Sequence, residues 1–149
     1  MNDKYNTILI VDDNPAILTA LKICLAGVFS RVVTLESPDN IVSTMCEEKV
    51  DVVLLDMNFS LGVNSGQDGL FWLRTLKKLH PDTPVVLMTA YADVQLAVKG
   101  LKNGAADFVT KPWDNDELVR TLRDAVEKSR EVVTLDELEQ QHVHRVVDQ

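Results

Sequence analysis

Five short apolar runs alternate along the chain with segments in which apolar residues recur every three or four positions. The runs lie at residues 7–11, 31–35, 50–56, 84–89 and 107–110 and are rich in Val, Leu and Ile. Such runs are typical of strands buried on both faces of a parallel sheet. The segments between them have helical spacing. This fivefold strand–helix alternation predicts an α/β fold, with a doubly wound parallel sheet, right-handed crossovers and helices on both faces.

Capping signals mark several helix ends. Asn14, followed by proline, is expected to cap the first helix, and Asp114 with Glu117 forms a capping box for the fifth. In the fourth helix, expected at residues 92–102, we predict that Leu96 and Leu101 point inward.

The pattern divides the chain into two parts. Residues 1–131 hold the five strand–helix units and are predicted to form one domain. Residues 132–149 are more polar and are interpreted as a linker or the start of an output domain. Thr134 and Glu137 form another capping box, which predicts that a new helix begins there.

Composition narrows the class of protein. The chain is 46% hydrophobic and 26% charged, as in ordinary globular proteins, and has no apolar run long enough to span a membrane and no signal peptide. We therefore expect a cytoplasmic protein without membrane contact. A net charge of -8 argues against direct binding of nucleic acid. Cys24 and Cys46 are expected to be buried, reduced thiols.

Four of the five predicted strands end in side chains that can react or bind a ligand. These are Asp12 and Asp13, then Asp56, Thr89 and Lys111. The carboxyl ends of parallel strands share one edge of the sheet, which is where α/β proteins bind their ligands. Three carboxylates crowded there repel one another, and a hard cation such as Mg²⁺ would relieve that repulsion.

The same set suits phosphoryl transfer. A carboxylate can accept a phosphoryl group, while a lysine and a hydroxyl stabilise its oxygens. Lys111 and Thr89 would supply those groups. The sequence has no glycine-rich nucleotide loop, so the donor is expected to be another protein or a small phosphodonor.

Five motifs together resemble the receiver domain of two-component response regulators, over residues 7–131. They are Val11-Asp12-Asp13-Asn14, Leu54-Leu55-Asp56-Met57, Leu87-Met88-Thr89-Ala90, Gly104-Ala105-Ala106-Asp107-Phe108 and Thr110-Lys111-Pro112. The resemblance implies a flavodoxin-like five-stranded sheet with strand order 2-1-3-4-5. It also implies a signalling domain whose only catalysis is its own phosphorylation and slow dephosphorylation.

The resemblance also implies a metal site. Asp56 would be the phosphoacceptor, and Asp13 and Asp56 would bind Mg²⁺ directly. Asp12 would act largely through water, and the backbone carbonyl of Asn58 would complete the set.

Further roles follow from the same resemblance. Lys111 would contact the phosphoryl group, and its peptide bond to Pro112 is expected to be cis. Thr89 and the backbone amide of Ala90 would receive a phosphoryl oxygen. Phe108 occupies the position of the switch aromatic, which turns inward on activation in relatives.

Two positions are implied to tune the phosphate lifetime. In the family, the positions of Asn58 and Tyr91 flank the path of the hydrolytic water, so the bulky Tyr91 predicts a persistent phosphate. The loop at 57–68 is longer than usual for the family and lacks the usual proline after the acceptor.

The implied partner is a sensor histidine kinase, with phosphorylation-dependent pairing into a homodimer. Residues 139–147 are similar to the opening helix of the DNA-binding domain of nitrogen-regulator-type activators, so DNA would be reached only through such an output domain. A stand-alone receiver that acts through protein contacts, or a degenerate scaffold, is the alternative. A haloacid-dehalogenase-type phosphatase is disfavoured, because Asn58 cannot serve as its general acid.

Overall fold

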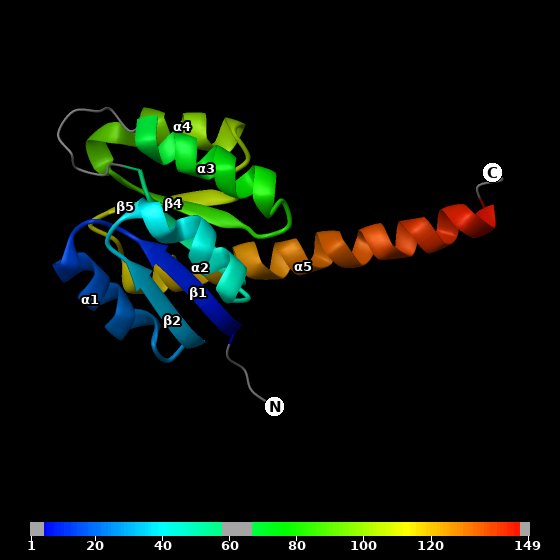
Figure 1. The fold of residues 1–149 in the computed structure, drawn as a ribbon, viewed down its shortest axis with the longest axis horizontal. Helices are drawn as coiled ribbons and strands as arrows, with labels where there is room; N and C mark the ends of the chain where they lie inside the picture. Colours follow the sequence, from blue (N-terminus) through cyan, green and yellow to red (C-terminus); the bar gives the residue numbers. More distant parts are fainter. Residues whose placement is uncertain (1–4, 58–66, 147–149) are drawn as a thin grey trace.

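The fold is described from a computed structural model, which places residues 5–57 and 67–146 (Figure 1). The elements in chain order are β1 (Tyr5–Val11), α1 (Pro15–Leu25), β2 (Phe29–Leu35), α2 (Ile41–Glu47), β3 (Val52–Asp56), α3 (Gln67–Leu79), β4 (Val85–Ala90), α4 (Val94–Lys102), β5 (Asp107–Lys111) and α5 (Asn115–Val146). Short 3₁₀ turns, Pro38–Asn40 and Tyr91–Asp93, precede α2 and α4. Each predicted strand is present, with its ends shifted by one or two residues at most.

The strands form one parallel sheet in the order β2-β1-β3-β4-β5, which confirms the predicted topology. In this register Val11 lies opposite Leu55, and Ala90 lies opposite Lys111. The carboxyl ends of β1, β3, β4 and β5 therefore meet at one edge of the sheet, and the residues that end or follow these strands are brought together.

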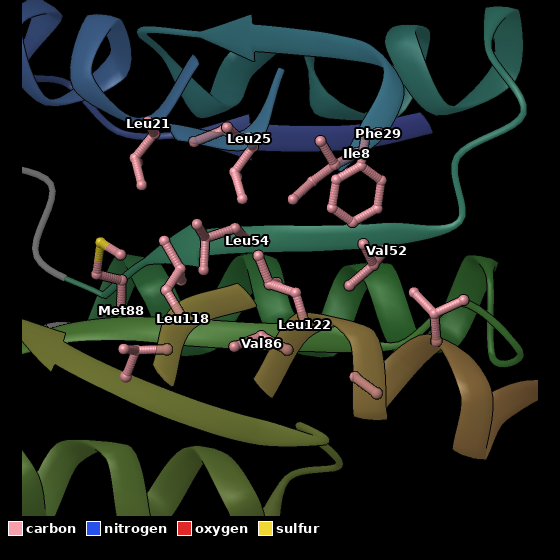
Figure 2. Packing of buried hydrophobic residues seen from close by; sticks show 14 of the residues in the cluster. Ile8, Leu21, Leu25, Phe29, Val52, Leu54, Val86, Met88, Leu118 and Leu122 are labelled. Carbon is pink, nitrogen blue, oxygen red and sulfur yellow. The ribbon is translucent and has the colours of Figure 1, made fainter. Parts of the chain in front are cut away.

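Alternating strand residues serve two cores, one on each face of the sheet. Ile8 and Leu54 pack with α1 and α5 on one face, whereas Leu9 and Leu55 pack with α2 and α3 on the other. Figure 2 shows the first core, in which Leu21 and Leu25 from α1 and Leu118 and Leu122 from α5 lie against the sheet. Both faces are covered, as the continuous apolar strands require.

The predicted caps are present. The Asn14 side chain accepts a hydrogen bond from the backbone amide of Ala16, and Asp114 accepts one from the amide of Glu117.

One prediction for α4 is wrong, because Leu101 is 37% exposed. The buried positions of this helix are Ala97 and Gly100, whose small size lets α4 approach β4 closely, and Leu101 lies about 100° around the helix from Gly100.

The structure also corrects the expected start of a new helix at Thr134. Helix α5 is continuous from Asn115 to Val146 and projects well beyond the rest of the molecule (Figure 1). Inside a continuing helix each backbone amide already bonds to the carbonyl four residues earlier, so a capping sequence has no free amide to satisfy.

No helix within the described residues combines the length and apolar character needed to cross a bilayer.

Both cysteines are free, as predicted, but only Cys24 is partly shielded, and Cys46 is exposed on α2. Cys46 is the penultimate residue of this short helix. The buried residues of α2 are Ile41 and Met45, and Cys46 lies about 100° around the helix from Met45.

Gly69, in the first turn of α3, should be required for the close approach of this helix to Met57. A Cβ atom at Gly69 would lie 2.8 Å from both the Cα and the carbonyl oxygen of Met57, which are backbone atoms. We expect Gly69→Ala to lower the free energy of unfolding by about 1–3 kcal/mol through overpacking. Gly27→Ala is the control, because nothing lies within 4 Å of its Cβ position. Equal stability of the two variants in urea denaturation would contradict this explanation.

Candidate functional site

Two buried carboxylates lie side by side at the carboxyl edge of the sheet. Asp56 ends β3 and Asp12 follows β1, and each residue is 1% exposed. The position of Asp12 is fixed by its backbone amide, which donates to the carbonyl of Leu35 at 3.1 Å, and by its Oδ1 atom, which accepts from the amide of Asn14 at 2.9 Å. The sequence predicted Asn14 only as a helix cap. Its second contact, the hydrogen bond from its backbone amide to Asp12, was signalled only by the presence of an aspartate two residues earlier.

Lys111, the last residue of β5, bridges these two carboxylates. Its Nζ atom lies 2.9 Å from Asp12 Oδ2 and 3.1 Å from Asp56 Oδ1. Burial alone would lower the pKa of Lys111, but the hydrogen bonds and negative charges of Asp12 and Asp56 outweigh burial and raise this pKa above the usual value. The ammonium is therefore firmly protonated at neutral pH and is the counter-charge of both acids.

Asp13 completes an acidic cluster. One carboxylate oxygen from each of Asp12, Asp13 and Asp56 lies within 4.8 Å of the other two, and Asp13 is partly open to solvent. Three carboxylates against one ammonium leave the cluster negatively charged. Such a set of oxygen donors, with one member facing water, fits Mg²⁺, which prefers carboxylates and retains several waters.

Thr89 and Lys111 come from neighbouring strands, with Thr89 one residue before the end of β4. Thr89 is fully buried, and its hydroxyl donates to the carbonyl of Asp93 at 3.4 Å, which is a long hydrogen bond. Ala90 lies opposite Lys111 in the register. The site edge thus combines a hydroxyl, an ammonium and three carboxylates, as the sequence predicted.

Phe108 and Pro112 lie on either side of Lys111 in β5 and the loop after it. Phe108 is partly buried and packs against the core on the α2–α3 face. The Lys111–Pro112 peptide bond is cis, in agreement with the prediction. Asn58, the side chain of Tyr91 and the loop at 58–66 lie outside the described residues, so the predictions for them stay predictions.

Comparison with known proteins agrees with this geometry. The family model for the response regulator receiver domain matches residues 8–123. The DNA-binding transcriptional regulator NtrC of Salmonella typhimurium is 34% identical over 122 residues, which is 82% of this chain and 25% of that protein. The C4-dicarboxylate transport transcriptional regulatory protein DctD of Pseudomonas aeruginosa is 34% identical over 131 residues, 88% of this chain and 27% of DctD. The chain thus spans about a quarter of the length of these relatives.

Solved structures give the same result. A receiver domain from Bacteroides fragilis superposes with a TM-score of 0.75 and is 51% identical, covering 83% of this chain and 98% of that domain. NtrX from Brucella abortus superposes with a TM-score of 0.79 at 28% identity, covering 89% of this chain and 28% of NtrX. The chain therefore belongs to the family of response regulator receiver domains and is related to the NtrC-type transcriptional regulators.

Proposed function

We propose that this domain accepts a phosphoryl group on Asp56 from a sensor histidine kinase in the cytoplasm, in a reaction that depends on Mg²⁺. The observation that carries the proposal is the position of the Lys111 ammonium between Asp12 and Asp56. This one ammonium is the counter-charge of two buried carboxylates at once. Here an acceptor, a cation and two further acids meet at the edge where ligands bind to open α/β sheets.

In the proposed reaction a carboxylate oxygen of Asp56 forms a bond to phosphorus while the bond to the donor breaks. The donor's leaving group is a histidine nitrogen or, for a small phosphodonor, an acetate oxygen. Lys111 would then stabilise a phosphoryl oxygen in place of its contact with Asp56. Asp13, Asp56 and the Asn58 carbonyl would hold Mg²⁺ with Asp12 acting through water, and the ion would neutralise charge that develops on the transferred group.

We further propose that Thr89 responds to phosphorylation by changing its hydrogen-bond acceptor. The phosphoryl group offers a stronger acceptor than the Asp93 carbonyl, whose hydrogen bond from Thr89 is long. Thr89 and the Ala90 amide would move toward the phosphoryl group, and Phe108 would turn inward into the space released. Tyr91 would slow hydrolysis by crowding the attacking water.

The relatives suggest the output. NtrC and DctD are named as transcriptional regulators and are about four times longer than the matched region. We propose that residues 1–131 form the receiver and that residues 132–149 lead toward a DNA-binding output, with phosphorylation favouring a homodimer. Sedimentation with and without phosphorylation tests the pairing, and a monomer in both conditions would contradict a phosphorylation-dependent homodimer.

The proposed function is tested by phosphoryl uptake. The chain should gain the mass of one phosphoryl group when it is incubated with acetyl phosphate and Mg²⁺, and should gain none when EDTA replaces Mg²⁺. Intact-mass spectrometry measures both. Equal uptake in EDTA, or no uptake in Mg²⁺ from either acetyl phosphate or a phosphorylated histidine kinase, would contradict the proposal.

Mg²⁺ should also raise the melting temperature, because it relieves repulsion in the acidic cluster and binds only the folded state. At a concentration about 100 times its Kd, it should stabilise the fold by about 2.7 kcal/mol. Asp13→Ala should remove most of this gain, whereas Asp39→Ala, an exposed aspartate before α2, should retain it. Thermal unfolding at several Mg²⁺ concentrations gives the comparison, and equal gains in all three proteins would refute a cluster-bound ion.

A further inference from the structure

Helix α5 leaves the domain at a point where two consecutive residues contact two different loops. The Ser129 hydroxyl donates to the backbone carbonyl of Asp82 at 2.8 Å, in the loop between α3 and β4. The Nη2 atom of Arg130 lies 4.0 Å from Oδ1 of Asp51, which is just before β3. Consecutive residues of a helix point about 100° apart, so the two contacts restrain α5 in two different directions.

Both anchors are themselves held in place. Asp51 is tied to β1, because its Oδ2 atom accepts from the Thr7 amide and its own amide donates to the Thr7 carbonyl, each at 2.9 Å. The loop around Asp82 is held by Lys77, whose Nζ atom donates to the carbonyls of the residues on either side of Asp82, Pro81 and Thr83, at 3.0 Å each. The two loops lead directly into β3 and β4, which are buried strands.

Among the side chains that the structure describes, apolar packing of α5 against the core ends before this point. The last α5 side chain in the described core is Val126, one turn before the two contacts. Between α5 and the α3–β4 loop there is a cavity of about 410 Å³, lined by residues that include Lys77, Asp82, Asp124, Lys128 and Ser129. The hydrogen bond from Ser129 to Asp82 therefore joins two segments that line this cavity.

We infer that Ser129 and Arg130 form an exit clamp that sets the direction in which α5 leaves the receiver. After the clamp the helix runs on to Val146 and projects from the domain (Figure 1). His144 lies 15 residues beyond Ser129, which makes a lever of about 22 Å, so each 10° of tilt at the clamp moves residue 144 by about 4 Å. A small restraint at the base thus decides where the far end of the helix lies.

The clamp is tested by the distance between two spin labels. One label is placed on Cys46, which is exposed on α2, and the other on His144→Cys, in a Cys24→Ala background. We expect a narrow distance distribution in this parent, and a distribution broader by about 4 Å or more, as for 10° of added tilt, in Ser129→Ala/Arg130→Ala. Ser129→Ala alone should broaden it more than Arg130→Ala alone, because the hydroxyl contact is shorter and the arginine side chain is 56% exposed.

Two controls separate direction from helix content. Ser129→Thr keeps the hydroxyl and should restore the narrow distribution, and Arg123→Ala, an exposed arginine two turns earlier in α5, should leave it unchanged. Helix content is followed by circular dichroism. An unchanged distribution in the double variant, a broad one already in the parent, or broadening that accompanies loss of helix would each overturn the exit clamp. None of these readings requires phosphorylation, so the result stands apart from the proposed function.

Discussion

Lys111→Met should destabilise the metal-free domain by roughly 2–3 kcal/mol at neutral pH. The substitution keeps most of the side chain's volume but leaves Asp12 and Asp56 side by side, each 1% exposed, without the ammonium that lies 2.9 and 3.1 Å from them. Removing one partner of a fully buried ion pair costs more than this, but the Lys111 side chain is 23% exposed, and solvent screening reduces the effect. The measurement is urea denaturation in EDTA.

The sign of the pH dependence follows from the raised pKa of Lys111. A group whose pKa is higher in the folded state contributes its full stabilisation below its unfolded pKa, which is about 10.4 for lysine. That stabilisation is lost as the pH rises through the folded pKa. The gap between parent and Lys111→Met should therefore be constant around neutrality and should narrow only in strongly alkaline buffer.

The matched control is Lys99→Met, an exposed lysine on α4, which should change stability by less than about 0.5 kcal/mol. Mg²⁺ should recover much of the loss in Lys111→Met, since a bound cation replaces the missing positive charge. Equal stability of the Lys111 and Lys99 variants in EDTA would show that the bridging contacts contribute nothing to the fold.

Asp56→Asn should abolish phosphoryl uptake from acetyl phosphate. An amide has nearly the same shape as the carboxylate but is a poor nucleophile, so the variant should fold and yet form no bond to phosphorus. Its stability in EDTA should be at least that of the parent, because one of three crowded negative charges is removed. Intact-mass spectrometry and urea denaturation on the same sample separate loss of chemistry from loss of folding.

Asp39→Asn is the control for this substitution, because it removes an exposed aspartate that is not a member of the acidic cluster. It should take up one phosphoryl group, as the parent does. Undiminished uptake by Asp56→Asn would place the acceptor elsewhere and would contradict the role given to β3.

Much of the site was predictable because it depends on strand ends alone. Once residues 50–56 are read as a buried parallel strand, Asp56 must reach the same edge as Asp12 and Lys111, whatever the details of the helices. The apolar runs predicted the central strands β3 and β4 well, because a strand buried on both faces has no exposed position that would call for a polar residue.

Features that depend on tertiary contact were predicted less well. The capping box at Thr134 is a local signal, and nothing local reveals that α5 arrives there as an intact helix. Leu101 fits an inward stripe by spacing, but Gly100 and Ala97 occupy the inward face because α4 packs close to β4. The double contact of Lys111 depends on side-chain geometry between strands, which spacing cannot give.

The most direct test locates the phosphoryl group itself. After incubation with acetyl phosphate and Mg²⁺, reduction with borohydride converts an aspartyl phosphate into homoserine, and tandem mass spectrometry of the peptides identifies the modified residue. We expect homoserine at position 56, with none at Asp12 or Asp13 and none in the EDTA sample. Homoserine at any other aspartate, or at position 56 without a divalent cation, would contradict it.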